Sequence, residues 1–360
     1  MVTNTIKTSY FRLLLMLHVS IALADNPSCS PDMTYTDAFM RSTGRYYMGA
    51  VYAQDPDICF GKAHITIPNG QPFNLIVYGN NTLSGYYGLI DNCRAVLIFR
   101  GSQDNELLPE IMSFLRDQES WINGTAASSF YVRSIRKFTQ EVLPNLTVIL
   151  NENPHAQLDI IGHSYGGAMA ALVLYQLKFN KIRNPIRVIS VASPKIGNSK
   201  LERDLSQHAG LHRIELESDP IPRFPPPMIG NMHYPTPSHR LIYVSTKSND
   251  VFANCSQINV QCPEPTCPSF TQLCKTAYIH VSYFMSEGQR LDFWGENNCA
   301  TTNKPSPPLD CSMASELPKL CPSSPPADDN LAKSLKFHTS ADVLISGENN
   351  FFAAQDPTAH

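Results

Sequence analysis

The residues best suited to chemistry in this sequence are Gly162-His163-Ser164-Tyr165-Gly166-Gly167. The apolar run Leu158–Ile161 precedes them and predicts a buried strand, and Ala168–Leu177 follows without a helix breaker and predicts a helix. Strand, G-x-S-x-G turn and helix together form a nucleophile elbow, in which the glycines permit a turn too sharp for side chains. The turn lifts the serine hydroxyl clear of the backbone, and the helix N-terminus stabilises an oxyanion beside it. We therefore predict that Ser164 is a catalytic nucleophile.

A serine nucleophile needs a histidine base and a carboxylate that orients this base, and in the α/β-hydrolase arrangement both follow the serine along the chain. Asp219 is the best candidate carboxylate, because it lies just past the strand-like run Arg213–Leu216. A parallel sheet presents functional groups at the C-terminal ends of its strands. An ordinary turn aspartate before proline is the alternative interpretation. Asp204 and Asp250 compete with it, but neither immediately follows an apolar run.

Several histidines follow this aspartate along the chain. They are His233, His239, His280, His338 and His360. Spacing alone does not choose between His239 and His280. The stretch Tyr278–Phe284 around His280 is apolar and aromatic, which suits the shielding of an imidazole from water. A core histidine satisfied by a backbone carbonyl is the alternative interpretation of this position.

Five motifs follow one another along the chain. They are Phe99-Arg100-Gly101-Ser102, Gly162–Gly167, Ser193–Asn198, Asp219–Pro226 and His280–Phe284. In this order they resemble the class 3 (fungal-type) lipase family of the α/β-hydrolase superfamily, and one motif alone is a weak signal. The resemblance implies that Asp219 and His280 complete a triad with Ser164. It also implies an oxyanion hole formed by the backbone N–H groups of Ser102 and Tyr165.

The chain departs from the family pattern at two places. Tyr165 replaces the more usual leucine, and its ring is expected to narrow the acyl pocket while its backbone still serves the oxyanion. A Cys-rich insertion at about residues 255–274 carries Cys255, Cys262, Cys267 and Cys274. This insertion is expected to reshape the rim that receives substrate.

Alternating strand and helix patterns predict a mostly parallel central sheet with helices on both faces, which the resemblance specifies as an α/β-hydrolase fold. The cysteines predict that disulfides stabilise this fold. The predicted helices are a lead-in centred on Asp37–Ala53, then Phe130–Leu143 and Ala168–Leu177. The predicted strands are Ala63–Ile67, Phe73–Tyr78, Tyr86–Ile90, Arg94–Phe99, Leu158–Ile161, Arg187–Val191 and Leu211–Leu216.

Residues 1–24 have the pattern of a secretory signal peptide, with basic residues before an apolar stretch and a cleavage site after Ala24. That stretch is too short for a membrane span, and no transmembrane anchor is expected. The hydrolase domain is expected over residues 25–300. A Pro/Ser-rich linker and C-terminal tail are expected over 301–360. The mature protein is therefore expected to be secreted and extracellular.

Ten cysteines agree with an oxidising destination, and disulfides are expected rather than a metal site. Cys29, Cys59 and Cys93 form an N-terminal group of three cysteines. Because three is odd, at least one of them must bond to a later cysteine if all ten pair within the chain. Cys29–Cys299 is the expected bridge of this kind. Sequons predict glycosylated surface positions at Asn80, Asn123, Asn145 and Asn254. The net charge of −3 gives no electrostatic footprint for nucleic acid.

An amphipathic helix is predicted after Ser102. Its apolar face consists of Leu107, Leu108, Ile111, Met112 and Leu115. The resemblance favours a lid that swings away from Ser164 and turns this face toward lipid. A fixed helix covering the sheet is the alternative.

Together these residues predict a secreted serine ester hydrolase that cleaves lipid esters at a lipid–water interface through an acyl-enzyme. Triacylglycerol is the expected substrate, and no cofactor is required. Phospholipase A1, galactolipase and feruloyl esterase activities use the same fold and triad. An inactive lipid-binding or storage protein is the alternative from another class, although a retired enzyme has no need to keep the whole triad.

Overall fold

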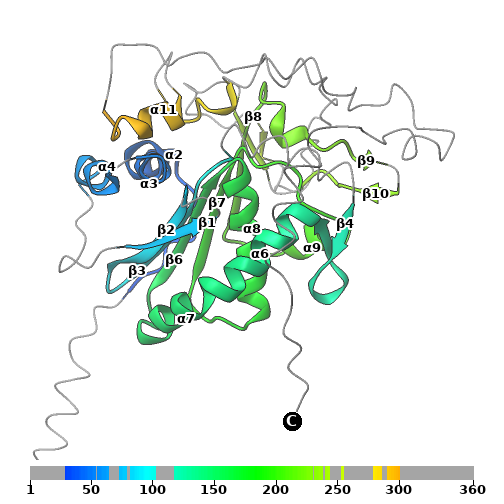
Figure 1. The fold of residues 1–360 in the computed structure, drawn as a ribbon, viewed down its shortest axis with the longest axis horizontal. Coiled ribbons are helices and arrows are strands. Elements are labelled where there is room, and N and C mark those ends of the chain that lie inside the picture. Colours follow the sequence, from blue (N-terminus) through cyan, green and yellow to red (C-terminus); the bar gives the residue numbers. More distant parts are fainter. Residues whose placement is uncertain are drawn as a thin grey trace, which may run out of the picture. The chain divides into compact units, whose positions relative to one another are not determined.

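The chain folds around an eight-stranded sheet of order β1-β2-β3-β6-β7-β8-β11-β12 in the part that the structure describes (Figure 1). The structure, a computed structural model, describes residues 29–53, 55–64, 73–78, 82–102, 117–229, 231–237, 240–243, 253–254, 279–285 and 290–300. The strands are β1 (Asn74–Tyr78), β2 (Thr82–Asp91), β3 (Arg94–Phe99), β6 (Gln157–His163), β7 (Ile186–Val191), β8 (Leu211–Leu216), β11 (Arg240–Tyr243) and β12 (Ala253–Asn254). Strands β3, β6, β7, β8 and β11 run parallel, and the outer strands pair antiparallel.

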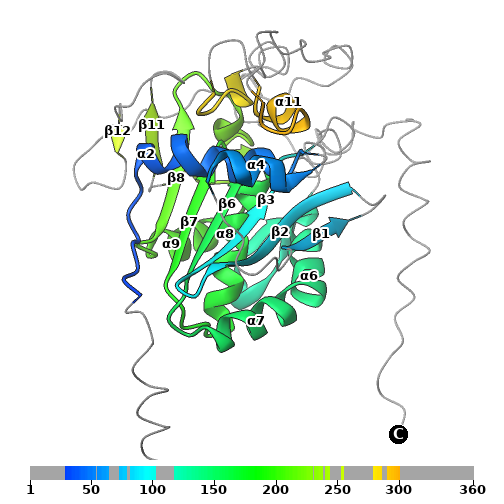
Figure 2. The same ribbon diagram turned by 90° about the vertical axis from the view of Figure 1, so that its left-hand side faces the viewer.

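Helices cover both faces of this sheet (Figure 2). One face packs against α6 (Ser129–Glu141), α7 (Leu143–Glu152), α8 (Tyr165–Phe179) and α9 (Ser199–Ser206). The other packs against α2 (Asp37–Phe39), the π-helical turn η1 (Met40–Gly44), α3 (Arg45–Ala50), α4 (Pro56–Lys62) and α11 (Leu291–Glu296). The described residues therefore form the two-faced α/β arrangement that the patterning predicts.

In the described part of the chain, two short hairpins and two 3-10 turns lie outside this sheet. The hairpins pair β4 (Gln118–Ser120) with β5 (Ala126–Ser128), and β9 (Met228–Ile229) with β10 (Met232–His233). The turns are η3 (Ile122–Gly124) and η4 (Ile221–Arg223).

Alternating side chains of β3 explain why its sequence is apolar throughout. Leu97 and Phe99 pack in the core beneath α6 and α8, whereas Val96 and Ile98 pack in the core beneath α3. Successive residues of a strand point to opposite faces, so a strand with helices on both sides needs apolar residues at every position. All seven residues of the neighbouring β6 are likewise buried.

The predicted elements hold best where the patterns are strongest. Strands β3 and β8 have the predicted bounds, and β6 and α8 extend their predicted runs. The predicted strand at Ala63–Ile67 is wrong at its start, because Ala63 and His64 form the turn that ends α4, and its other residues lie outside the described ranges. Asp55 begins that helix by accepting a hydrogen bond from the Asp57 N–H, with Pro56 at the first helical position.

The predicted helix Phe130–Leu143 is two helices in the structure. Helix α6 ends at Glu141, and α7 begins at Leu143 with Pro144 in its first turn. A proline is tolerated there because the first N–H groups of a helix have no intrahelical acceptor.

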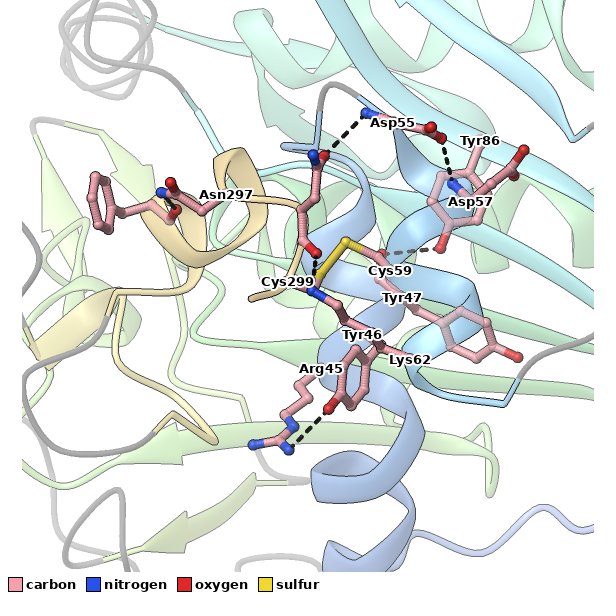
Figure 3. The surroundings of a disulfide bond; sticks show 12 residues. Arg45, Tyr46, Tyr47, Asp55, Asp57, Cys59, Lys62, Tyr86, Asn297 and Cys299 are labelled. Atoms are coloured by element: carbon pink, nitrogen blue, oxygen red, sulfur yellow. Dashed lines mark hydrogen bonds between the residues drawn. A yellow bond between two sulfur atoms is a disulfide. The ribbon is translucent and has the colours of Figure 1, made fainter. Parts of the chain in front are cut away.

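Two disulfides involve the N-terminal cysteines, namely Cys29–Cys93 and Cys59–Cys299. The expected Cys29–Cys299 bridge is therefore wrong, although a bridge does join the N-terminal group to the end of the described chain. Cys59 lies in α4, and Cys299 lies in the turn after α11 (Figure 3). The Nζ atom of Lys62 also donates to the carbonyl of Asn298, 2.8 Å away. The bridge thus holds α4 and α11 together on one face of the sheet.

Several predicted features lie outside the described residues. They are the signal peptide (1–24), the lid residues Leu107, Leu108, Ile111, Met112 and Leu115, the cysteines of the insertion (255–274), and the tail (301–360). Among the helices that the structure does describe, none is long and apolar enough to cross a membrane.

Loss of the Cys59–Cys299 bridge is expected to destabilise the fold more than loss of Cys29–Cys93. Replacing both Cys59 and Cys299 by alanine should lower the free energy of unfolding by about 2–5 kcal/mol. Replacing Cys29 and Cys93 should cost about 1 kcal/mol less, because their bridge closes a loop of 64 residues and the Cys59–Cys299 bridge closes one of 240. Denaturant unfolding of the two double variants measures this difference, and a larger loss for the shorter loop would contradict it.

Candidate active site

Ser164 lies at the turn between β6 and α8, where the backbone is held in a strained conformation. Its φ is 57° and its ψ is −124°, a region that non-glycine residues rarely adopt. The Ser164 N–H donates to the carbonyl of Val191 at the end of β7, 2.8 Å away. A side chain at Gly162 would overlap the Gly166 carbonyl, and one at Gly166 would overlap the Phe99 carbonyl. This local geometry is that of a nucleophile elbow.

Asp219 and His280 meet in a hydrogen bond, although 61 residues separate them. The His280 Nδ1 atom lies 2.9 Å from Asp219 Oδ2. An ionised carboxylate only accepts, so Nδ1 donates, and in the neutral imidazole this leaves Nε2 as an acceptor. Asp219 is 1% exposed and His280 is 8% exposed, so the pair is shielded from solvent. This tautomer is the one that a general base requires.

The loop after β8 fixes the orientation of the Asp219 carboxylate. The Asp219 N–H donates to the carbonyl of Leu216, the last residue of β8, over 3.0 Å. Its Oδ1 atom accepts from the N–H of Ile221 over 2.9 Å. Oδ2 therefore faces His280 while Oδ1 is held by the start of η4.

Tyr283 is a second donor to Asp219 Oδ2, and the sequence patterns assigned it no role. Its hydroxyl donates to Asp219 Oδ2 over 2.9 Å and accepts from the Leu216 N–H over 2.7 Å. Burial, followed by the nearby Asp219 charge, raises the pKa of Tyr283 well above its ordinary value, so the hydroxyl keeps its proton. The only hint in the sequence at a role for Tyr283 was its position in an apolar stretch, three residues after His280.

His163 connects the serine strand to the His280 loop. Its Nε2 atom lies 2.7 Å from the His280 carbonyl oxygen, and the two imidazole rings are 4.7 Å apart. Burial, followed by the neighbouring His280, lowers the pKa of His163 to about 3, so the ring is neutral and Nε2 donates. The residue before Ser164 is therefore bonded to the backbone of His280.

The predicted oxyanion loop begins beside the elbow. Strand β3 pairs in parallel with β6 so that Phe99 stands opposite Gly162. The Gly101 N–H donates to the hydroxyl of Tyr52 over 3.0 Å, and the guanidinium of Arg100 donates to the Gly101 carbonyl over 2.7 Å. These bonds fix the backbone directly before Ser102, which is half-buried. Tyr52 is a further residue whose role the sequence patterns did not indicate.

The competing carboxylate and histidine candidates have other surroundings or lie outside the described residues. Asp204 accepts from Lys200 over 2.7 Å and from the Tyr175 hydroxyl of α8 over 3.0 Å. His233 is exposed and lies 2.7 Å from the Ser199 hydroxyl. His239 and Asp250 lie outside the described ranges. Within those ranges, no group of three His, Cys, Asp or Glu side chains could hold a metal ion.

Two of the four sequon asparagines have described side chains. Asn123 is exposed at the tip between β4 and β5, and Asn145 is exposed on α7. Asn80 lies outside the described residues, and Asn254 is described only as part of the backbone of β12.

Comparisons with known proteins give matches to fungal lipases. A family model described as "Lipase (class 3)" matches residues 96–229. The chain is 25% identical over 187 residues to the secreted mono- and diacylglycerol lipase A of Penicillium cyclopium, covering 51% of this chain and 59% of that protein. It is 22% identical over 232 residues to a lipase of Rhizopus niveus, covering 62% of this chain and 57% of that protein. The matches thus span less than two thirds of these curated relatives.

Solved structures extend the likeness in fold. The mono- and diacylglycerol lipase of Aspergillus oryzae has a TM-score of 0.51 and 17% identity, covering 72% of this chain and 99% of that chain. The parallel sheet, its two helical layers and the serine elbow define an α/β-hydrolase fold. The family match spans Ser102, Ser164 and Asp219, so residues 96–229 are similar to the class 3 (fungal-type) lipase family. His280 lies beyond the matched segment.

Replacing Tyr283 by phenylalanine is expected to lower kcat about 10-fold on a soluble ester such as p-nitrophenyl butanoate, with KM unchanged. The reason is that a hydrogen bond to a charged group contributes about 1.5–3 kcal/mol, and here it orients the Asp219 carboxylate. Tyr86→Phe is the matched control, because it also removes a buried hydroxyl, one that donates to the Tyr47 carbonyl away from the site. If Tyr283→Phe and Tyr86→Phe lose equal stability and have equal kcat values, Tyr283 is merely structural.

Replacing His163 by glutamine is expected to weaken the acid sensitivity of the fold. The folded pKa of about 3 lies below the unfolded value, so between about pH 6.5 and 3 only the unfolded chain binds this proton. His163 therefore makes the free energy of unfolding fall by about 1.4 kcal/mol per pH unit as the pH drops through that range. Unfolding curves at several pH values should show a shallower decline in His163→Gln, which retains a donor for the His280 carbonyl. Parallel declines would refute this assignment.

Proposed function

We propose that the chain is a secreted serine ester hydrolase that cleaves lipid esters. The single observation that carries the proposal is the buried Asp219–His280 hydrogen bond beside a strained serine elbow. His163 connects the serine elbow to the Asp219–His280 pair, because it precedes Ser164 and its ring forms a hydrogen bond with the His280 backbone. A binding protein has no need for this combination of strain and burial.

The mechanism follows from the positions of these groups. His280 accepts the Ser164 proton at Nε2 while the serine oxygen attacks the ester carbonyl. Asp219 holds the imidazole in the required tautomer and stabilises its charged form. The imidazolium then donates the proton to the leaving alcohol, and water hydrolyses the acyl-enzyme with His280 again acting as the base. This sequence of steps requires no cofactor.

The oxyanion of each tetrahedral intermediate is assigned to the N–H groups of Ser102 and Tyr165. Tyr165 begins α8, so its N–H belongs to the positive end of that helix. Ser102 follows the backbone that Tyr52 and Arg100 hold beside the elbow. Removing one such donor typically costs about 3–4 kcal/mol of transition-state stabilisation.

Acylglycerols are the proposed substrates, with triacylglycerol the first to test. Curated relatives from Penicillium cyclopium and Fusarium solani are named secreted mono- and diacylglycerol lipases, which supports partial glycerides as a second candidate and agrees with an extracellular location. The amphipathic segment that carries Leu107, Leu108, Ile111, Met112 and Leu115 is proposed as a lid over Ser164, and residues 1–24 as a signal peptide. The exposed Asn123 and Asn145 agree with glycosylation during secretion.

Fatty-acid release by the protein and its Ser164→Ala variant tests this function. Emulsified triacylglycerol and diacylglycerol are titrated through their solubility limits. We expect a rate that rises abruptly as aggregates form, and a loss of at least about 10³-fold in Ser164→Ala, because the residual catalysis lacks the nucleophile. The greater of the two initial rates identifies the preferred glyceride.

Ser206→Ala is the control, because it removes a surface hydroxyl from the end of α9. Equal release by the protein and Ser164→Ala would exclude the proposed nucleophile. A smooth rise in rate through the solubility limit would exclude the lid.

A further inference from the structure

Three aromatic rings pack between the first turns of α6 and α8. The ring of Tyr165 lies parallel to that of Tyr131, with centroids 5.7 Å apart and an interplanar angle of 11°. Phe130 meets the same ring edge-on, at 5.5 Å and 67°. Offset stacking and edge-to-face packing are the favoured geometries of aromatic pairs. Tyr165 is therefore held from two sides by α6.

These rings lie at the same edge of the sheet as Ser164. Helix α8 begins directly after β6, and α6 begins directly after β5. The Ser128 N–H at that start donates to the carbonyl of Ile196, in the loop that follows β7. Figure 1 shows the two helices lying side by side on one face of the sheet. Both first turns therefore lie near the C-terminal ends of β6 and β7.

Helix geometry directs these side chains toward that edge. Each Cα–Cβ bond in an α-helix tilts toward the N-terminus, so a first-turn side chain covers the surface before its own backbone. Before Tyr165 stands Ser164, whose hydroxyl is the proposed nucleophile. Tyr165 and Phe130 are half-buried, so both retain solvent-accessible surface.

The position of Tyr165 is fixed from behind. Tyr131 is 0% exposed and belongs to the core beneath α6 and α8. Cores are packed at crystal-like density, so Tyr131 does not yield when a substrate presses on the ring stacked against it. A leucine at position 165 would lack this stacking and would occupy less volume.

We propose that Phe130 and Tyr165 form a rigid aromatic wall beside Ser164 that admits straight acyl chains and excludes acyl groups branched at the carbon next to the ester carbonyl. This inference rests on the proposed ester hydrolysis and names its substrate class more closely. The wall acts on the acyl group because that group becomes bonded to Ser164 as the alcohol leaves and stays bonded until water releases the acid. The atoms next to the carbonyl are those held closest to residue 165.

Two isomeric soluble esters test the wall without an interface. These are p-nitrophenyl butanoate and p-nitrophenyl 2-methylpropanoate, which have the same carbon count and differ in branching beside the carbonyl. The measured quantity is the kcat/KM ratio of the branched to the straight ester. A loss common to both substrates, such as a shifted oxyanion donor, cancels in this ratio. The variants are Tyr165→Leu and Phe130→Leu, with Tyr165→Phe as the matched control that keeps the ring.

We expect the ratio to rise about tenfold in Tyr165→Leu and to rise in Phe130→Leu, because one methyl group in a fitted pocket changes specificity by about 10- to 200-fold. It should stay within about twofold in Tyr165→Phe, which retains the wall. An unchanged or lower ratio in the leucine variants overturns the proposal, and Phe130→Leu alone decides if Tyr165→Leu does not fold. If Ser164→Ala releases p-nitrophenol as fast as the unmodified protein, the proposed function itself fails, and the wall fails with it.

Discussion

The close approach of three backbone segments at Gly166 is the constraint on which the candidate site depends. Strand β6 turns into α8 so sharply that a side chain at Gly162 would overlap the Gly166 carbonyl. A side chain at Gly166 would in turn overlap the carbonyl of Phe99 at the end of β3. The same contact therefore holds Ser164 in its strained conformation and keeps the loop of Ser102 beside it. The elbow and the proposed oxyanion loop are consequences of one packing arrangement.

A network of buried charged side chains fixes β8 and β11 relative to the loop that follows β7. Arg213 of β8 donates to Glu215 Oε1 over 2.9 Å and to the carbonyl of Pro194 over 3.0 Å, in the loop after β7. Arg240 of β11 donates to the second oxygen of Glu215 over 3.2 Å. Breaking one partner of such a network leaves an uncompensated buried charge. The network thus ties β8, whose end leads to Asp219, to both of its neighbours.

The helical layer that contains α3, α4 and α11 supports the candidate site from the face of the sheet opposite α6 and α8. Tyr52, just past α3, holds the backbone at Gly101, and the Cys59–Cys299 bridge holds α4 to the turn after α11. Helix α11 is tied in turn to the His280 segment, because the Leu291 N–H donates to the Val281 carbonyl over 2.7 Å. The ends of the described chain therefore meet on this face and support the histidine loop.

Local patterns in the sequence determined the elements that depend on neighbouring residues. The strand–glycine–helix order around Ser164 specified the elbow, and the apolar runs specified β3 and β8 to the residue. The same reasoning failed at Ala63, where the apolar pattern did not reveal the end of a helix. It also did not anticipate the break between α6 and α7, although Pro144 marks the start of the second helix.

The pairings between distant residues depend on tertiary structure, and local patterns in the sequence did not determine them. Spacing left His239 and His280 as equal candidates until the resemblance to a family favoured one, and the hydrogen bond to Asp219 spans 61 residues. The partner of Cys299 is Cys59 rather than Cys29, and Tyr283 and Tyr52 have roles that no motif indicated. Periodicity and turn chemistry act over a few residues, and are therefore legible in the sequence. Which distant side chains meet depends on how the sheet and its two helical layers pack, and no local pattern records that.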